Sequence, residues 1–243
     1  MWRRLLILML ASALLSASNG CAVIDYFFVD TPEETALELF QLGQDEMAQE
    51  EWEDAVEYFI TLRDRYPFSP YTIQAELLLA DAYFNNKNYA EAIVAYKEYE
   101  SLHPSDQRIP YVLFQLGLAN YKSMSSIDKP QNHARESVEY FQRLIQSHPT
   151  SEYAAKAKDS LLQARRQLAE HELFVADFYW RAGRYGSAWE RYTYVADNFK
   201  DVPEAAGYAE KRSRLAFLER QQNAAESARV KNHGSWKQWF DWL

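Results

Sequence analysis

Apolar residues recur at helical spacing along most of the chain, and one such pattern is written several times. In residues 52–67 the pattern is a small residue, an aromatic, a leucine and a proline: Ala55, Phe59, Leu62 and Pro67. The same offsets return at Ala92, Tyr96, Tyr99 and Pro104, at Ser137, Phe141, Leu144 and Pro149, and more loosely at Ala188, Tyr192 and Val195. The first two copies are 37 residues apart, a period typical of stacked helix pairs.

Each residue type in the pattern has a physical role. A small side chain lets two helices approach closely, an aromatic ring fills the space against the neighbouring hairpin, and proline ends the helix. The segment before each copy supplies the other helix of the pair, with a small residue at its eighth position, Gly43 or Ala80. These positions match the tetratricopeptide repeat (TPR) pattern. The sequence therefore predicts an all-α, TPR-like solenoid of about five helical hairpins over residues 33–231.

The same periodicity predicts the individual helices. Eight residues inserted in the third hairpin, Ser123–Pro130, are polar and predict a surface loop. No proline or glycine interrupts residues 152–182, which predicts one long helix or two nearly collinear helices. The remaining helices are expected at 33–49, 52–66, 71–86, 88–102 and 187–199, with a final pair at 204–220 and 222–231.

The first twenty residues do not follow the repeat pattern. Two arginines precede an apolar run, residues 5–15, which is too short to span a bilayer. Residues 1–20 are therefore predicted to be a signal peptide, followed by a tether over residues 21–32. Cys21 is the only cysteine and follows Gly20 at the expected cleavage site. We expect Cys21 to carry the lipid of a bacterial lipoprotein, with an unmodified free cysteine as the alternative.

Composition and charge narrow the class of partner. The chain has 243 residues, of which 25% are charged, and its net charge is −9. Removal of residues 1–20, which carry two arginines and no acidic residue, makes the charge −11. An acidic chain without a basic cluster is a poor nucleic-acid binder, so we expect no nucleic-acid partner.

No pattern for catalysis stands out. The five histidines are scattered, and His171, on a predicted helix, has no second histidine or cysteine at metal-ligand spacing. There is no glycine-rich phosphate loop and no nucleophile motif. The sequence therefore predicts a protein that is not an enzyme, with no catalytic residues, no metal and no cofactor.

The first helix of each TPR hairpin lines the concave face of the solenoid. In the first three hairpins these positions are mostly apolar and aromatic, which predicts a groove for an extended segment with aromatic side chains. The alternative is that some of these side chains belong to the core between repeats. The groove residues are Phe40, Met47, Leu77, Phe84, Tyr111, Phe114 and Tyr121.

Residues 232–243 form a tryptophan-rich tail. Trp236, Trp239, Phe240 and Leu243 fall on one face of a short helix. The tail is expected either to fold back onto the last hairpin or to contact a membrane interface or a partner groove.

Several local runs carry a resemblance to a known family. They are Arg65–Tyr71, Tyr111–Asn120, Pro130–Arg135 and Glu172–Tyr179. Together with the signal peptide, the cysteine and the hairpins, they resemble the BamD family, TPR lipoproteins of the outer-membrane β-barrel assembly machine. The resemblance covers roughly residues 21–230. It departs from the family in the residues just before Cys21, in a shorter insert, and in the tail.

The resemblance implies a role, a location and partners. The protein would be a non-catalytic scaffold anchored by lipid to the periplasmic face of the outer membrane. It would bind β-signals of nascent outer-membrane proteins in its N-terminal groove. Its C-terminal half would contact the barrel subunit, with Arg191 as the expected ion-pairing residue, and other lipoproteins would complete the complex.

Two other functions are equally compatible with these sequence features. A TPR lipoprotein of this kind also suits a pilus or secretion complex. It equally suits an accessory that positions a peptidoglycan synthase or hydrolase.

Overall fold

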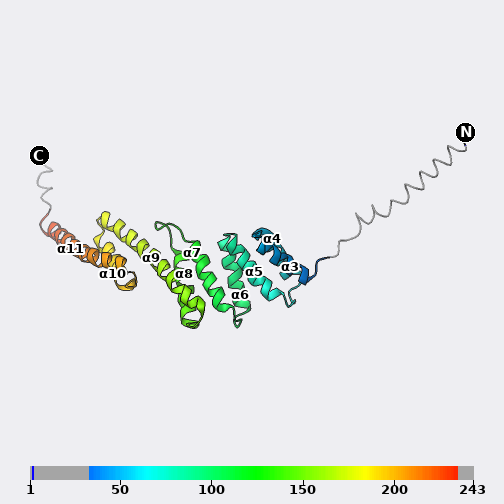
Figure 1. Cartoon of the computed structure of the whole chain (residues 1–243). Helices are drawn as coiled ribbons and strands as arrows, with labels where there is room; N and C mark the ends of the chain where they lie inside the picture. The colour runs from blue at the N-terminus through cyan, green and yellow to red at the C-terminus, as the bar shows by residue number, and fades with distance from the viewer. Residues whose placement is uncertain (1, 3–32, 235–243) are drawn as a thin grey trace.

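The computed structural model describes Trp2 and residues 33–234, and the elements of this part from residue 33 onward are helices (Figure 1). In these residues it contains no strand, which confirms the all-α prediction. The helices are α3 (Ala36–Ala48), α4 (Trp52–Arg65), α5 (Thr72–Asn85), α6 (Tyr89–Leu102), α7 (Ile109–Lys122), α8 (Asn132–Ser147), α9 (Glu152–Arg181), α10 (Tyr185–Asn198) and α11 (Pro203–His233).

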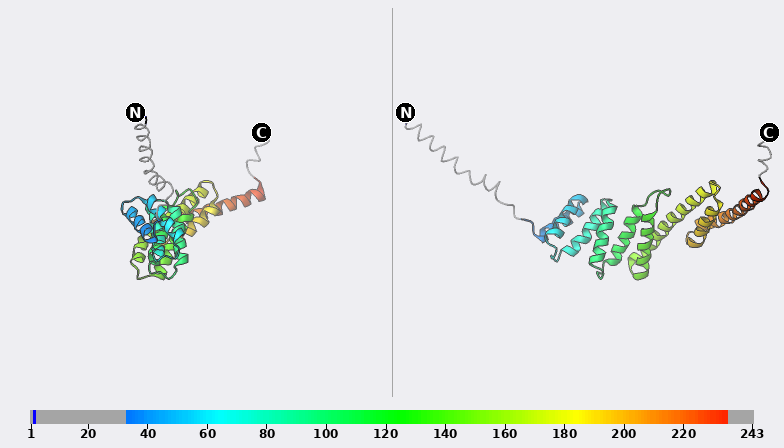
Figure 2. Two further views of the ribbon diagram at one scale, coloured as in Figure 1. Left: turned by 90° about the vertical axis from the view of Figure 1, so that its right-hand side faces the viewer. Right: turned by 180° about the vertical axis from the view of Figure 1, so that it is seen from behind.

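Consecutive helices pack side by side and stack into an elongated solenoid, with α3 and α11 at opposite ends (Figures 1 and 2). The first four pairs, from α3 and α4 to α9 and α10, are antiparallel hairpins, and α11 packs against α10. The TPR-like solenoid expected from the repeat is therefore confirmed.

The repeated small and aromatic positions meet inside each hairpin. A Cβ atom added at Gly43 would lie 2.5 Å from the ring of Phe59, and one added at Gly117 would lie 2.4 Å from the ring of Phe141. Both rings are fully buried. In the second hairpin Ala80 and Tyr96 are likewise fully buried in one cluster. The missing side chain lets the two helices of a hairpin close onto one ring.

Two predicted helix boundaries were wrong. The first helix begins at Ala36 rather than 33, because the Thr35 side chain accepts a hydrogen bond from the backbone N–H of Glu38, and the Glu38 carboxylate accepts one from the backbone N–H of Thr35. The predicted final pair is the single helix α11. Residues 221–223 (Gln-Gln-Asn) are polar but compatible with a helix, and no glycine or proline lies between Gly207 and Gly234 to end it.

The inserted segment 123–131 is non-helical and is held against α9. The side-chain amide of Gln167 donates to the carbonyl of Ser125 at 2.9 Å, and Nδ1 of His171 lies 2.5 Å from the carbonyl of Ile127. The buried Gln131 side chain donates to the carbonyls of Ser126 and Lys129. We call this segment the brace, since it joins the loop end of the third hairpin, between α7 and α8, to the middle of α9.

The expectations for the termini concern residues outside the described part. The signal peptide, the tether, Cys21 and the tail from residue 235 onward all lie there. Within the described part, no helix combines the length and the apolar character that crossing a membrane requires.

Candidate protein-binding site

The predicted groove residues come from α3, α5 and α7, the first helices of the first three hairpins. Two of them are core residues, since Phe40 is 7% exposed and Leu77 is 6% exposed. The ring of Phe40 stacks on Tyr71 at 5.4 Å, so the next hairpin covers it. For these two positions the structure favours the alternative given above, a place between repeats.

The other five groove residues are partly exposed: Met47, Phe84, Tyr111, Phe114 and Tyr121. Phe114 lies 5.8 Å from the ring of Tyr153, and Tyr111 lies 5.4 Å from the same ring. Tyr153 belongs to the first turn of α9 and was not predicted as part of the groove. Its only signal in the sequence is its place just after Ser151, which caps that helix. We call Phe84, Tyr111, Phe114, Tyr121 and Tyr153 the aromatic face.

A partly buried carboxylate, that of Asp81, orients one ring of this face. Asp81 accepts hydrogen bonds from the hydroxyls of Tyr96 at 2.5 Å and Tyr111 at 2.7 Å, and Gln115 donates to the Tyr111 hydroxyl at 2.9 Å. Burial raises the pKa of Asp81 above its ordinary value, although the hydroxyl hydrogen bonds oppose the shift. Burial also raises the pKa of Tyr96 and Tyr111, so both remain protonated donors at neutral pH.

Replacement of Asp81 by asparagine is expected to change stability in a pH-dependent way. Because the pKa of Asp81 is raised above 3.8 in the folded state, the protonated form is favoured by folding. The wild-type chain therefore loses this contribution as the pH rises through the raised pKa, and the variant, which cannot ionise, does not. Urea unfolding of both proteins between about pH 4 and pH 7 measures the difference. A difference that stays constant over that range would contradict the expectation.

The C-terminal half contains a second cluster of the same design. Asp177 accepts from the hydroxyls of Tyr192 and Tyr208, as Asp81 does from Tyr96 and Tyr111. Here Arg212 takes the place of Gln115, and its guanidinium lies 4.2 Å from the ring centre of Trp180. Neither cluster was predicted from the sequence. The signal was an aspartate fifteen residues before the repeat tyrosine in each case.

Arg191 lies on α10, with 45% of its side chain exposed. Its guanidinium pairs with the carboxylate of Glu172 on α9 at 2.5 Å. The side chain is therefore ordered by a contact within the chain, and part of it faces solvent.

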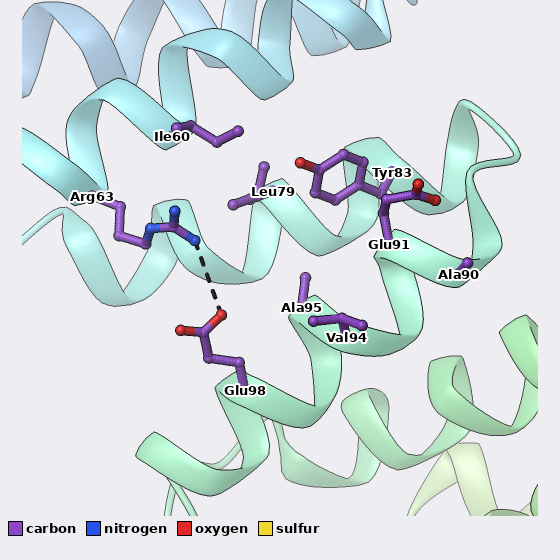
Figure 3. Close-up of a pocket in the computed structure, with 9 residues that line it drawn as sticks. All are labelled: Ile60, Arg63, Leu79, Tyr83, Ala90, Glu91, Val94, Ala95 and Glu98. Atoms are coloured by element: carbon purple, nitrogen blue, oxygen red, sulfur yellow. Dashed lines mark ion pairs between the residues drawn. The ribbon is translucent and has the colours of Figure 1, made fainter.

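A cavity of about 330 Å³ has none of the aromatic-face residues in its lining (Figure 3). Helices α4, α5 and α6 form it, and Arg63 and Glu98 face each other at its edge at 3.9 Å. Its walls are mainly apolar: Ile60, Leu79, Tyr83, Ala90, Val94 and Ala95. Across residues 33–234, no three His, Cys, Asp or Glu side chains are grouped so that they could hold a metal ion.

Comparison with known proteins gives the family. A family model described as YfiO, outer membrane lipoprotein, matches residues 32–231. The outer membrane protein assembly factor BamD of Vibrio cholerae is 26% identical over 201 residues, covering 79% of this chain and 82% of the relative. BamD of Neisseria gonorrhoeae is 28% identical over 207 residues, covering 79% and 76%. The chain therefore belongs to the YfiO family of outer membrane lipoproteins, which includes BamD.

Proposed function

We propose that this protein is a non-catalytic lipoprotein that takes part in assembling β-barrel proteins into the outer membrane. Membership of the YfiO family supports the location, and the relatives named outer membrane protein assembly factor support the process. The anchor we propose is lipid on Cys21, outside the described residues, which would hold the solenoid at the periplasmic face.

The proposal that this protein binds a peptide segment rests on the aromatic face. Partly exposed rings from α5, α7 and α9 pack against one core cluster, and the α7 rings of Tyr111 and Phe114 contact the α9 ring of Tyr153. Such rings bury a large apolar area and pair favourably with other rings. The ligand we propose is an extended C-terminal segment of a nascent barrel protein that carries aromatic side chains.

The double substitution Phe84→Ala with Phe114→Ala tests this role. We expect affinity for an aromatic-ended peptide to fall at least about tenfold, because truncated aromatic anchors commonly lose this much binding energy. Fluorescence anisotropy with a labelled peptide measures the affinity, and barrel assembly in cells gives the second readout. Phe68→Ala is the matched control, since Phe68 is 99% exposed in a turn. Unchanged affinity and unchanged assembly in the double variant would reject the proposal.

Arg191 is the contact that we propose for the barrel subunit. In this proposal its partly exposed guanidinium donates hydrogen bonds to a carboxylate of the partner, while Glu172 holds its orientation. Arg191→Ala is expected to reduce the barrel subunit recovered in a pulldown from solubilised envelopes by about tenfold, as loss of a paired interface charge often does. Arg65→Ala is the control, since Arg65 is an arginine of similar exposure with a glutamate partner in the N-terminal half. Equal recovery with Arg191→Ala would remove this residue from the interface, and recovery of a secretin or a cell-wall synthase instead would contradict the assembly role.

A further inference from the structure

The cavity between α4, α5 and α6 is an apolar groove that the proposed function does not use. Val94, at its rim, is 65% exposed, and the small side chains of Ala90 and Ala95 leave the space open. A narrow extension lined by Glu76 and Tyr99 continues from it. Its volume of about 330 Å³ suits one or two bulky apolar side chains.

The chain enters the solenoid close to one end of this groove. The hydroxyl of Tyr66, which follows α4, donates to the carbonyl of Glu34 at 2.9 Å, and Arg65 lies 3.6 Å from the Glu34 carboxylate. Arg63, which lines the groove, lies in the last turn of α4 and precedes Tyr66 by three residues. Residue 34 is therefore fixed beside the end of α4 from which the groove begins.

The segment before residue 34 is long enough to reach the groove. From Glu34 back to Phe28 is six residues, which span up to about 20 Å when extended. From Tyr66 to Ile60 along α4 is about 9 Å at the rise of a helix. The tryptophan-rich tail is too far away to occupy the groove, because α11, which precedes it, lies at the opposite end of the solenoid (Figures 1 and 2) and nine residues span only about 30 Å.

The composition of that segment matches the groove. Residues 22–32 (Ala-Val-Ile-Asp-Tyr-Phe-Phe-Val-Asp-Thr-Pro) are mostly apolar and carry three adjacent aromatics, Tyr26, Phe27 and Phe28. An aromatic ring left in water loses the free energy that its burial would provide. We propose that the tether folds back along α4 and seats Phe27 or Phe28 in the groove between α4 and α6 of the same molecule.

Docking of this kind would set the distance between the solenoid and the membrane. With the aromatic residues seated, only residues 22–25 separate Cys21 from the docked segment, instead of the whole tether. This consequence rests on the proposed lipid at Cys21, whereas the docking itself does not. The first hairpin would then be held close to the bilayer in one orientation rather than ranging on a free linker.

A photo-crosslink in the full membrane-anchored chain tests the docking. The photoreactive residue p-benzoyl-phenylalanine is placed at Val94, and the control carries it at Glu139, an exposed position on α8. The expected product is an internal adduct between residue 94 and the peptide 22–32, at a yield about tenfold above the control, since a buried ring is mostly in contact with its site. Phe27→Ser with Phe28→Ser should lower the yield to that of the control.

Other crosslinking outcomes overturn the proposal. An adduct at twice the chain mass would assign the groove to a second copy, and an adduct with a different protein would assign it to a partner. A yield equal to that of the Glu139 control would leave the tether undocked. None of these results depends on peptide binding by the aromatic face or on barrel assembly, so failure here and failure of the proposed function are separate.

Proteolysis supplies a second readout that needs no crosslinker. Chymotrypsin cuts after aromatic residues, and a docked tether is cut only when it opens. Val94→Arg places a charge in the groove at an exposed position, so the helical fold should be kept, which circular dichroism checks. We expect cleavage at residues 26–28 to become about tenfold faster in this variant, because cleavage follows the open fraction. An equal cleavage rate in both proteins would refute docking.

Discussion

Phe141→Ala is expected to lower the free energy of unfolding by about 3–5 kcal/mol. The Phe141 ring is fully buried, lies 6.0 Å from the ring of Phe114, and fills the space opposite Gly117. Its loss removes apolar burial and leaves a cavity between α7 and α8 that rigid helices cannot close. Urea unfolding followed by circular dichroism measures the change.

The control for this substitution is Phe68→Ala. The residue type is the same, but Phe68 is 99% exposed, so its removal should change stability by less than about 0.5 kcal/mol. Similar stabilities of the two variants would mean that the repeat aromatic does not hold the third hairpin together.

Gly117→Ala is expected to destabilise the chain by about 1–3 kcal/mol, although alanine favours a helix more than glycine does. The added Cβ would lie 2.4 Å from the Phe141 ring, which is closer than packed carbon atoms approach. Either the ring must shift or α7 and α8 must separate. Thermal and urea unfolding measure the loss, and Gly207→Ala, where an added Cβ meets nothing within 4 Å, is the matched control.

The cause can be isolated with a double substitution. In a chain that already carries Phe141→Ala, the clash at Gly117 is absent, so Gly117→Ala should cost little or should stabilise α7 through its helix propensity. If Gly117→Ala were equally destabilising in both backgrounds, the contact with Phe141 could not explain it.

The hairpins were predictable because their signals are local. A small residue, an aromatic and a proline at fixed offsets within one segment define both the packing and the end of each helix, as at Ala92, Tyr96 and Pro104. Where a breaker is missing, the same reasoning fails. Residues 204–231 lack a central glycine or proline, and the expected final pair is one continuous helix, α11.

The candidate site was predictable only in part, because exposure depends on the neighbouring helix. Phe40 and Phe114 occupy the same repeat position, yet Tyr71 covers Phe40 while Phe114 keeps part of its ring exposed. Tyr153 joins the aromatic face from α9, about forty residues further along the chain than Phe114. Such contacts between distant segments leave no spacing pattern in the sequence. The groove formed by α4, α5 and α6 could not be predicted from the sequence either, since it arises from space left between helices.

Because α9 is long, one continuous helix belongs to the packing of both halves of the solenoid. Its 30 residues form one rod of about 45 Å, whose first turns pack on the third hairpin and whose last turns pack on α10. The brace is hydrogen-bonded to this helix at Gln167 and His171, near the middle of its length. Truncation within α9 would therefore expose apolar residues, such as Ala157 and Ala169, that pack on the neighbouring helices.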